Sequence, residues 1–531
     1  MNALGAPPFL LSLMTTSASL PFFLFALPAG AICDLINRRI LLIATYLWLA
    51  TAAGMLAFSS WLHLVNPFYI LITAFLLGVG YAFGAPAWAA IIPEVVPKSE
   101  LPSAIILSGV QMNLAGIVGP ALGGLLLSTA GPGMIFSLNA LVFLFAVVMI
   151  ERWYHERPRS GPYLEGFMES FASTARYVRY TPGLQIILTR DFSFGFFIAV
   201  VPALLPVVAL KQLQLQASQL GLLFTSLGIG SLIGGALILP YARTKFAPNT
   251  LTILASVILV LVFLLMAVVP SPWIFFPVAA LAGISWTISA SELWIAGQRA
   301  MPDWVRGRMN AVHMMVSQGG VALGGVLWGW SATSLGLGKT LVGGAIFLGA
   351  CLALAIPLSI NFAHSLDLEP APLEGRHNFP LALKPNDGPV TITIEFTIAP
   401  ENWGTFLAAV EQVRQAFLRN GAFLCNIDED LERPGTFRAE MLVSSWAEHL
   451  RQLARMTKSD SEALRRVLEM HVASEAPVVR HYLRANRGST PLGLGQVRKL
   501  IEPWLPKAIA VARESKKGRH IEPKQPLSGE N

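Results

Sequence analysis

Eleven long apolar runs constrain this chain more than any other feature of its sequence. A helix needs about 20 consecutive, mainly apolar residues to cross the hydrocarbon core of a bilayer. The runs span residues 8–33, 40–61, 68–92, 103–129, 133–151, 186–210, 219–241, 250–269, 273–297, 309–333 and 340–361. Charged residues make up only 13% of the chain, against roughly 25% in soluble domains. The sequence therefore predicts an all-α polytopic membrane protein with eleven spans.

The connecting loops alternate between basic and nearly neutral. The basic loops carry Arg38 and Arg39, Lys98, the cluster Arg152, Arg157, Arg159, Arg176 and Arg179, then Arg243 and Lys245, and finally Arg299, Arg306 and Arg308. The opposite loops carry Lys211 and Lys339. Because Lys and Arg collect on the cytoplasmic side, the basic loops and everything after residue 361 are predicted to be cytoplasmic. The net charge of +7 is therefore interpreted as a topology signal, and nucleic-acid binding is not expected.

A polar central loop, 152–185, divides the runs into an N-terminal bundle of five spans (1–151) and a C-terminal bundle of six (186–361). The two halves contain similar short sequence patterns at corresponding loops. "PEVV" at 93–96, followed by "SAIILSGV", resembles "PDWV" at 302–305, followed by "NAVHMMVS". Internal repeats of this kind are typical of secondary transporters.

The composition changes after residue 361. A Pro-rich linker (362–388) leads to residues 389–485, where strand and helix patterns follow in the order β-α-β-β-α-β. This order predicts a ferredoxin-like α+β domain. The tail, 486–531, is basic, and its amphipathic part is interpreted either as a segment on the anionic inner leaflet or as disordered chain. The three cysteines, Cys33, Cys351 and Cys425, have no metal-ligand spacing, so neither a metal site nor a disulfide framework is expected.

Several of these segments carry a family resemblance. "GAICDLINRR" (30–39) resembles the loop after the second helix of the major facilitator superfamily, and "GIVGPALGG" (116–124) resembles its antiporter Gly-Pro motif. With "LPFFLFALPAG", "PDWVRGR" and "SSWAEHLRQ", the chain resembles enterobactin-exporter-like transmembrane secretion effectors that end in an antibiotic-biosynthesis-monooxygenase-like domain. In that family a helix precedes the segment that resembles 8–33. The resemblance therefore implies a major facilitator fold with eleven spans instead of twelve, without the first helix.

The resemblance also implies a conformational latch in the first basic loop, formed by Gly30, Asp34, Arg38 and Arg39. Asp34 would sit at a helix end and pair with a basic residue or a helix N-terminus in one state of the transporter. Gly30 would let two helices approach closely. The alternative is that Arg38 and Arg39 serve only to fix the topology.

Ionisable residues inside spans are costly and are functional hypotheses by default. Asp191, beside Arg190, is a candidate for proton coupling because leaving water favours the neutral form of a carboxyl group. The alternative is a simple ion pair with its neighbours. Glu292 appears in the sequence as a lone carboxylate deep in a span, so it is interpreted as a proton shuttle, a cation site or a solvated group.

Two further sets of residues complete the predicted site. Gln111, Asn113 and Trp286 are candidates for the substrate path, with interhelical hydrogen bonding as the alternative for the two amides. Tight helix packing and bending is predicted for a motif of small residues and one proline. Its members are Gly116, Gly119, Pro120, Gly123 and Gly124.

The sequence thus predicts a multi-pass transporter in the bacterial inner (plasma) membrane and not an enzyme. It would export small amphiphilic molecules, such as a siderophore, a drug or a secondary metabolite, by alternating access and proton antiport. Its partners would be the small-molecule substrate, protons and the lipid bilayer, with homodimerisation through the C-terminal domain and no cofactor. The alternatives are a membrane-tethered, cofactor-independent monooxygenase and a non-transporting scaffold.

Overall fold

The computed structural model describes residues 7–97, 100–152, 167–268, 271–360, 366–371 and 383–484. Most of the predicted linker and the whole basic tail after residue 485 lie outside these residues. The chain divides into two compact units. One contains Met1–Pro370 with Thr457–Ser459, and the other contains Ala371–Met456 and Asp460–Asn531.

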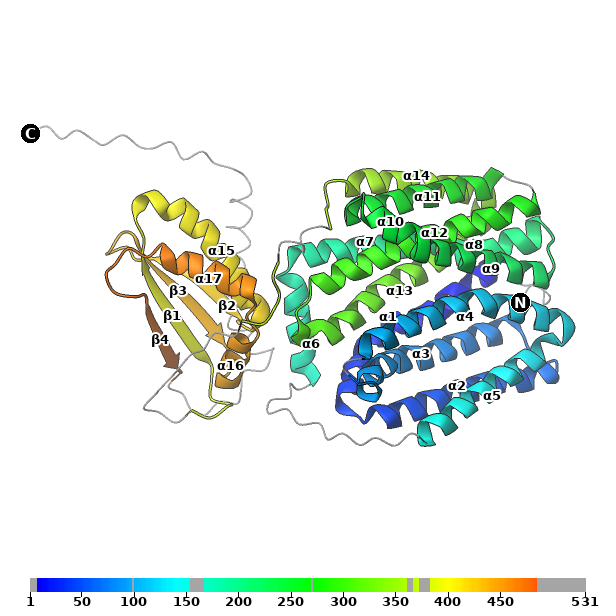
Figure 1. Cartoon of the computed structure of the whole chain (residues 1–531), viewed down its shortest axis with the longest axis horizontal. Coiled ribbons are helices and arrows are strands. Elements are labelled where there is room, and N and C mark those ends of the chain that lie inside the picture. Colours follow the sequence, from blue (N-terminus) through cyan, green and yellow to red (C-terminus); the bar gives the residue numbers. More distant parts are fainter. Residues whose placement is uncertain are drawn as a thin grey trace, which may run out of the picture. The chain divides into compact units, whose positions relative to one another are not determined.

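The first unit is a bundle of long helices that run roughly parallel to one another (Figure 1). The N-terminal five are α1 (Pro8–Leu35), α2 (Arg38–Trp61), α3 (Pro67–Val95), α4 (Leu101–Thr129) and α5 (Gly131–Arg152). The later ones are α6 (Phe167–Arg179), α7 (Pro182–Ile198), α8 (Val200–Val207), η2 (Val208–Gln212), α9 (Ala217–Leu232), η3 (Ile233–Ile238), α10 (Leu239–Arg243), α11 (Pro248–Val268), α12 (Pro272–Arg299), α13 (Asp303–Ser334) and α14 (Leu337–Ala355).

Ten helical segments among the described residues are long and apolar enough to cross a membrane. The eleventh predicted run, 103–129, falls in α4, where the apolar stretch is Leu114–Thr129. The predicted all-α polytopic fold is confirmed. Proline begins α1, α3, α7, α11 and α12, where its missing N–H costs nothing because the first turn has no intrahelical acceptor for it.

The burial pattern of the bundle suits a lipid environment. Large apolar side chains face outward, for example Phe145 (63% exposed) and Ile346 (69%). Several polar side chains are fully buried instead, including Ser12 and Ser285. The hydroxyl of Ser285 donates to the carbonyl of Ala255 at 2.6 Å. Hydrocarbon supplies no hydrogen-bond partners, so polar groups are placed where the protein itself provides them.

Two antiparallel helix pairs join the early helices to the late ones, α1 with α13 and α4 with α9. Along α1 and α13, Gly30 lies opposite Ala311 and Ser12 lies opposite Gly329. The hydroxyl of Thr16 donates to the Ala322 carbonyl at 2.8 Å between them. Small residues therefore let the two backbones approach along the length of this contact.

The contact of α4 with α9 uses part of the predicted small-residue motif. A Cβ on Gly228 of α9 would lie 2.6 Å from the Gly116 carbonyl oxygen, and one on Gly221 would lie 2.7 Å from that of Pro120 and 3.0 Å from Gly124 Cα. By contrast, a Cβ at Gly119 or Gly123 would meet nothing within 4 Å. The motif therefore packs α4 on α9 through Gly116, Pro120 and Gly124, and the other two glycines are not needed for this contact.

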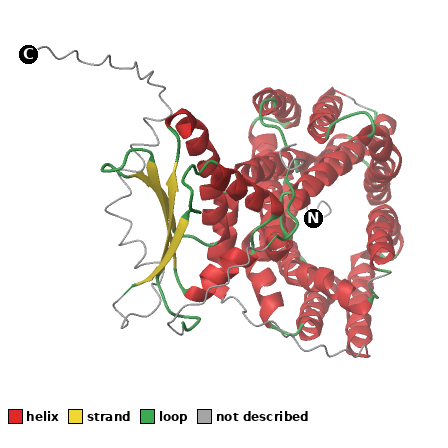
Figure 2. Cartoon of the chain, turned by 60° about the vertical axis from the view of Figure 1, so that its left-hand side comes forward, coloured by secondary structure: helices red, strands yellow, loops and turns green. Residues whose placement is uncertain are grey.

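The second unit is a four-stranded antiparallel sheet with three helices (Figure 2). Its elements are β1 (Val390–Thr397), α15 (Trp403–Asn420), β2 (Leu424–Glu429), β3 (Thr436–Val443), α16 (Trp446–Ala454), α17 (Lys458–Glu469) and β4 (Val478–Leu483). The sheet order is β2-β3-β1-β4. Phe406 of α15 packs on Phe396 and Phe437, with ring centroids 5.5 and 5.1 Å apart. The predicted α+β character of this region is confirmed.

Buried charges fix the helices of this unit to one another. Glu448 forms ion pairs with Arg451 at 2.8 Å and with Arg455 at 3.1 Å. Arg455 also donates to the carbonyl of Asn420 at 2.9 Å, in the last turn of α15. Burial lowers the pKa of the Arg455 guanidinium to about 10. The pair with Glu448 offsets part of the desolvation cost that causes this shift.

Cys425 is expected to be chemically inert while the second unit is folded. Its side chain is only 5% exposed, and burial raises the pKa of its thiol to about 12. The reactive thiolate is therefore nearly absent at neutral pH. With Cys33 and Cys351 replaced by Ser, iodoacetamide at pH 7.5 should leave the native protein unmodified by intact-mass analysis and should alkylate it after denaturation. Rapid alkylation of the native protein would contradict the buried placement.

The α4–α9 contact predicts opposite tolerance for two Gly→Ala changes. Gly228→Ala should lower the melting temperature of the purified protein in detergent, because overpacking of this kind costs about 1–3 kcal/mol. Gly119→Ala is the matched control and should leave the melting temperature unchanged or raise it, since alanine has open space there and is the better helix former. Equal melting temperatures would show that α4 and α9 do not approach as described.

Candidate functional site

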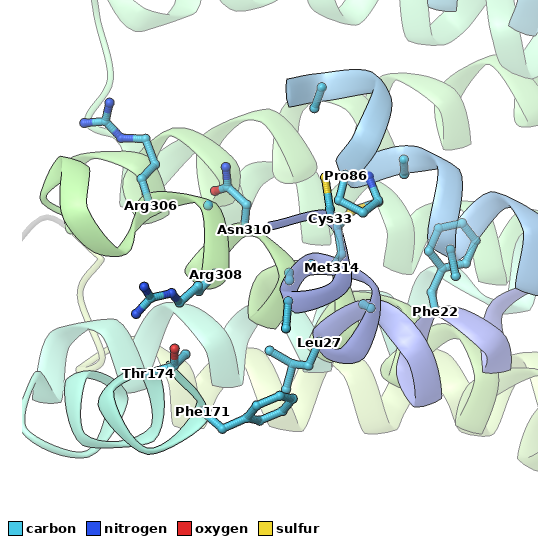
Figure 3. Close-up of a pocket in the computed structure, with 18 of the residues that line it drawn as sticks. Phe22, Leu27, Cys33, Pro86, Phe171, Thr174, Arg306, Arg308, Asn310 and Met314 are labelled. Carbon is cyan, nitrogen blue, oxygen red and sulfur yellow. The ribbon is translucent and has the colours of Figure 1, made fainter. Parts of the chain in front are cut away.

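The first cavity considered lies among α1, α3, α6 and α13 and has a volume of about 410 Å³ (Figure 3). Apolar side chains, including Phe22, Leu27 and Met314, form much of its wall. Arg306 and Arg308 of α13 also line it. Figure 3 shows Arg308 extending toward α6, where it donates to the hydroxyl of Ser173 at 3.0 Å.

The predicted latch residues divide between this cavity and the helix ends beside it. The helices continue through most of the predicted loop, since α1 ends at Leu35 and α2 begins at Arg38. Gly30 and Arg38 line the cavity. Arg39 instead donates from Nε to the Ile150 carbonyl at 3.3 Å and from Nη2 to the Glu151 carbonyl. It therefore holds the end of α5 to the start of α2. The side chain of Asp34 lies outside the described part of the structure.

The second cavity is formed by four elements of the later half: α7, the η3–α10 segment, α12 and α13. Its volume is about 560 Å³. Charged and aromatic groups from all four elements meet there. They include Asp191, Arg243, Trp294 and His313, with Ser317 and Gln318 beside them.

Asp191 and His313 form a buried pair on the wall of the second cavity. Asp191 Oδ2 lies 3.4 Å from His313 Nε2, and the two residues are 3% and 6% exposed. The hydroxyl of Ser317 donates to the Asp191 carboxylate. The ring of Trp294 meets the imidazole edge to face at 4.9 Å. Within the described residues, Asp191 Oδ2 and His313 Nδ1 accept or donate no hydrogen bond.

Arg190 does not neutralise Asp191. Its guanidinium reaches α11 instead, where Nη2 donates to the Thr252 hydroxyl at 2.7 Å and Nη1 donates to Asn249. Consecutive residues of a helix point about 100° apart, so adjacent charges on α7 face different neighbours. Asp191 instead forms a carboxylate–imidazole pair with His313 on another helix.

Glu292 is not the lone carboxylate that the sequence suggested. It is 2% exposed and forms an ion pair with Arg243, with Nε and Oε1 2.6 Å apart; the Arg243 side chain is 40% exposed. Arg243 ends α10, which follows the π-helical segment η3. A π-helical turn contains an extra residue and so changes the direction of the side chains beyond it. The pairing was missed because its partners lie 49 residues apart.

Two of the remaining predicted residues, Trp286 and Gln111, line neither cavity. Trp286 of α12 is half-buried and packs against the apolar core of the later helices. Gln111 is exposed on α4, and the side chain of Asn113 lies outside the described residues. The substrate path predicted through these three residues is therefore not assembled by the described side chains.

Sequence reasoning missed His313, although a signal was present. A histidine in the apolar run 309–333 is an ionisable residue within a span, the same criterion that selected Asp191 and Glu292. It was noted only as part of a repeated motif. Among the described residues, no group of three or more His, Cys, Asp or Glu side chains is placed to hold a metal ion.

Comparisons with known proteins agree with this fold. Residues 1–489 match the family described as transmembrane secretion effector. Macrolide efflux protein A of Streptococcus pyogenes is 23% identical over 368 residues, 68% of this chain and 89% of that protein. Enterobactin exporter EntS of Salmonella paratyphi A is 26% identical over 292 residues, 51% of this chain and 68% of that protein.

A solved structure gives the same fold. The inward-facing, unoccupied structure of a bacterial homolog to the human lysosomal transporter Spinster has a TM-score of 0.54 at 15% identity, covering 68% of this chain and 91% of that one. The fold and the buried charges define a multi-pass membrane transporter of the major facilitator type. Within that class, the chain belongs to the transmembrane secretion effector family.

The Arg243–Glu292 pair should behave as a buried ion pair whose two halves depend on each other. Arg243→Ala leaves the Glu292 carboxylate buried without a counter-charge. It should cost about 2 kcal/mol, reduced from the cost of breaking a fully buried pair because Arg243 is partly exposed. Adding Glu292→Gln should restore much of the loss, as read from melting temperatures of the single and double variants. Additive losses would show that the residues do not interact.

Proposed function

We propose that this protein exports small amphiphilic molecules, such as a drug, siderophore or secondary metabolite, across the bacterial inner membrane by alternating access and proton antiport. The names of its relatives, macrolide and enterobactin exporters, support this substrate range. The observation that carries the proposal is the buried Asp191–His313 pair, which joins α7 to α13 beside a cavity large enough for a drug-sized ligand.

Asp191 is the better of the two candidates for the proton site. Glu292 already has a permanent counter-charge, because Arg243 remains protonated at all physiological pH values. Asp191 faces His313, and both a carboxyl group and an imidazole can take up or release a proton. A proton can therefore be gained or lost by the Asp191–His313 pair, whereas the Arg243–Glu292 pair keeps its charges. Arg190, the remaining charged neighbour, is engaged with α11.

We keep the latch hypothesis but assign its residues to two different helix contacts. Arg39 braces α2 against α5 within the early helices. Gly30 and Arg38 act at the contact of α1 with α13, where the two halves meet, and Asp34 would pair with a basic residue or a helix N-terminus in one state. Opening of that contact would change the surroundings of Gly30 and Arg38 but not those of Arg39. Gln111, Asn113 and Trp286 remain only hypothetical substrate contacts.

The proposed topology follows the basic loops. It places the central loop (152–185), the linker (362–388), the C-terminal domain (389–485) and the tail (486–531) in the cytoplasm, around bundles 1–151 and 186–361. The strand order β2-β3-β1-β4 supports a ferredoxin-like fold related to antibiotic-biosynthesis monooxygenases. In that setting the domain would pair two protomers through its sheet, with a regulatory role.

The proton proposal predicts different outcomes for two carboxylate variants in proteoliposomes with an imposed pH gradient. Asp191→Asn should reduce gradient-driven transport of a labelled macrolide or enterobactin at least tenfold, while exchange without a gradient continues. Glu292→Gln removes a buried carboxylate of the same kind and should retain gradient dependence. Monodisperse elution of each variant in gel filtration controls for folding. Undiminished gradient-driven transport by Asp191→Asn would refute this assignment, and transport of neither substrate by the wild type would refute the export proposal.

A further inference from the structure

We propose that the second cavity binds the ammonium group of a singly protonated amine, with the Asp191 carboxylate as its counter-ion. This inference deepens the export function proposed above and rests on it. It assigns a chemical class to the group that the cavity accepts: one positive charge on an otherwise apolar body.

The charges around the cavity leave Asp191 as the group that needs a cation. Arg243 and Glu292 neutralise each other at 2.6 Å, and Arg190 is directed to α11. His313, when neutral, contributes no charge. The cavity then holds one uncompensated negative charge on a residue that is 3% exposed. Burying an isolated carboxylate is strongly unfavourable, so the site gains most from a ligand that brings a single positive charge.

The hydrogen bonds of Asp191 leave room for that ligand. The hydroxyl of Ser317 already donates one hydrogen bond to the carboxylate. Oδ2 accepts no hydrogen bond from the described residues, and the His313 imidazole lies 3.4 Å from it. An ammonium group is a compact donor of up to three hydrogen bonds. It can therefore satisfy Oδ2 in a way that the present neighbours do not.

The other walls of the cavity suit the remainder of such a molecule. Trp294 lines the same cavity, and an indole ring attracts cations through its π-electrons. Leu239, Ile295 and Met314 provide apolar surface. The volume of about 560 Å³ lies within the range of drug-binding pockets. An anionic ligand would find Arg243 already paired and would be repelled by Asp191.

A proton taken up by the Asp191–His313 pair, on either residue, removes the negative charge that the ammonium group would otherwise neutralise. A proton and an ammonium group are therefore alternatives at one site, and amine binding should weaken as the pH falls. Three charged residues of the described part lie near the pair and have other partners: Arg190 on α7, Arg243 on α10 and Glu292 on α12.

A series of ligands with one body and three head groups tests this directly. 4-Phenylbutylamine, 4-phenylbutanol and 4-phenylbutanoate would be titrated into the full-length protein in nanodiscs at pH 7.5 by calorimetry, with empty nanodiscs subtracted. The amine should bind at least tenfold more tightly than the alcohol, and the carboxylate should bind most weakly. Lowering the pH to 5.5 should weaken only the amine. Equal affinities for amine and alcohol, or preference for the carboxylate, would overturn the proposal.

Variants test whether Asp191 causes the preference for the amine. Asp191→Asn should abolish the preference for the amine, and Asp191→Glu, which keeps the charge, should preserve it. His313→Gln should keep the preference for the amine, because the Asp191 carboxylate remains. Glu462→Gln, the same chemical change on the exposed helix α17, is the control. If Asp191→Asn does not fold, the wild-type head-group series and Asp191→Glu still decide the question.

The binding assay and the transport assay fail independently. An amine preference that depends on Asp191, together with no gradient-driven transport by the wild type, would support the binding site and refute the export function on which its role rests. Gradient-driven transport with no preference for the amine would leave the export function standing and overturn the ammonium site. Retention of the amine preference by Asp191→Asn would likewise overturn it.

Discussion

Charge burial in a medium of low polarity is the constraint on which the later half of this transporter depends. Each ionisable group placed there needs a partner, and the partner decides what the group can do. Glu292 has an arginine, which keeps its proton, so the pair stays charged. Asp191 has a histidine, which does not, so its charge balance can change. Two carboxylates that look equivalent along the chain therefore belong to different kinds of site, although Asp191 and the Arg243 partner of Glu292 line the same cavity.

Close helix packing determines where the two halves of the bundle meet. Small residues line both contacts, α1 with α13 and α4 with α9, and backbone atoms approach where a side chain would otherwise stand. Without a hydrophobic driving force between helices in lipid, such contacts depend on van der Waals packing and interhelical hydrogen bonds. Two such interhelical hydrogen bonds run from Thr16 to the Ala322 carbonyl and from Thr225 to the Ile117 carbonyl. Both cavities adjoin α13, so the helix that closes one contact also carries His313.

The helical architecture was predictable from sequence because bilayer thickness and backbone hydrogen bonding leave few alternatives. The strands of the second unit were predictable from the alternation of apolar and polar residues, as in β1. The candidate site was predictable only in part. The criterion of ionisable residues within spans found Asp191 and Glu292. Their partners, His313 and Arg243, come from other helices. Hydropathy does not show which way each helix is rotated about its axis, so the pairs could not be predicted. Arg39 shows the same limit: its partners are backbone carbonyls of α5, which no side-chain motif reveals.

The π-helical segment η3 has a consequence for how relatives of this chain should be aligned. It contains one residue more than an α-helical turn of the same length, and each residue of an α-helix rotates the next by about 100°. A one-residue deletion within Ile233–Ile238 that restored a regular α-helix would remove this extra residue and leave Arg243 facing Glu292. A single gap at this place in an alignment is therefore compatible with an intact ion pair. A one-residue gap within α10 would instead rotate Arg243 by about 100° and separate the pair.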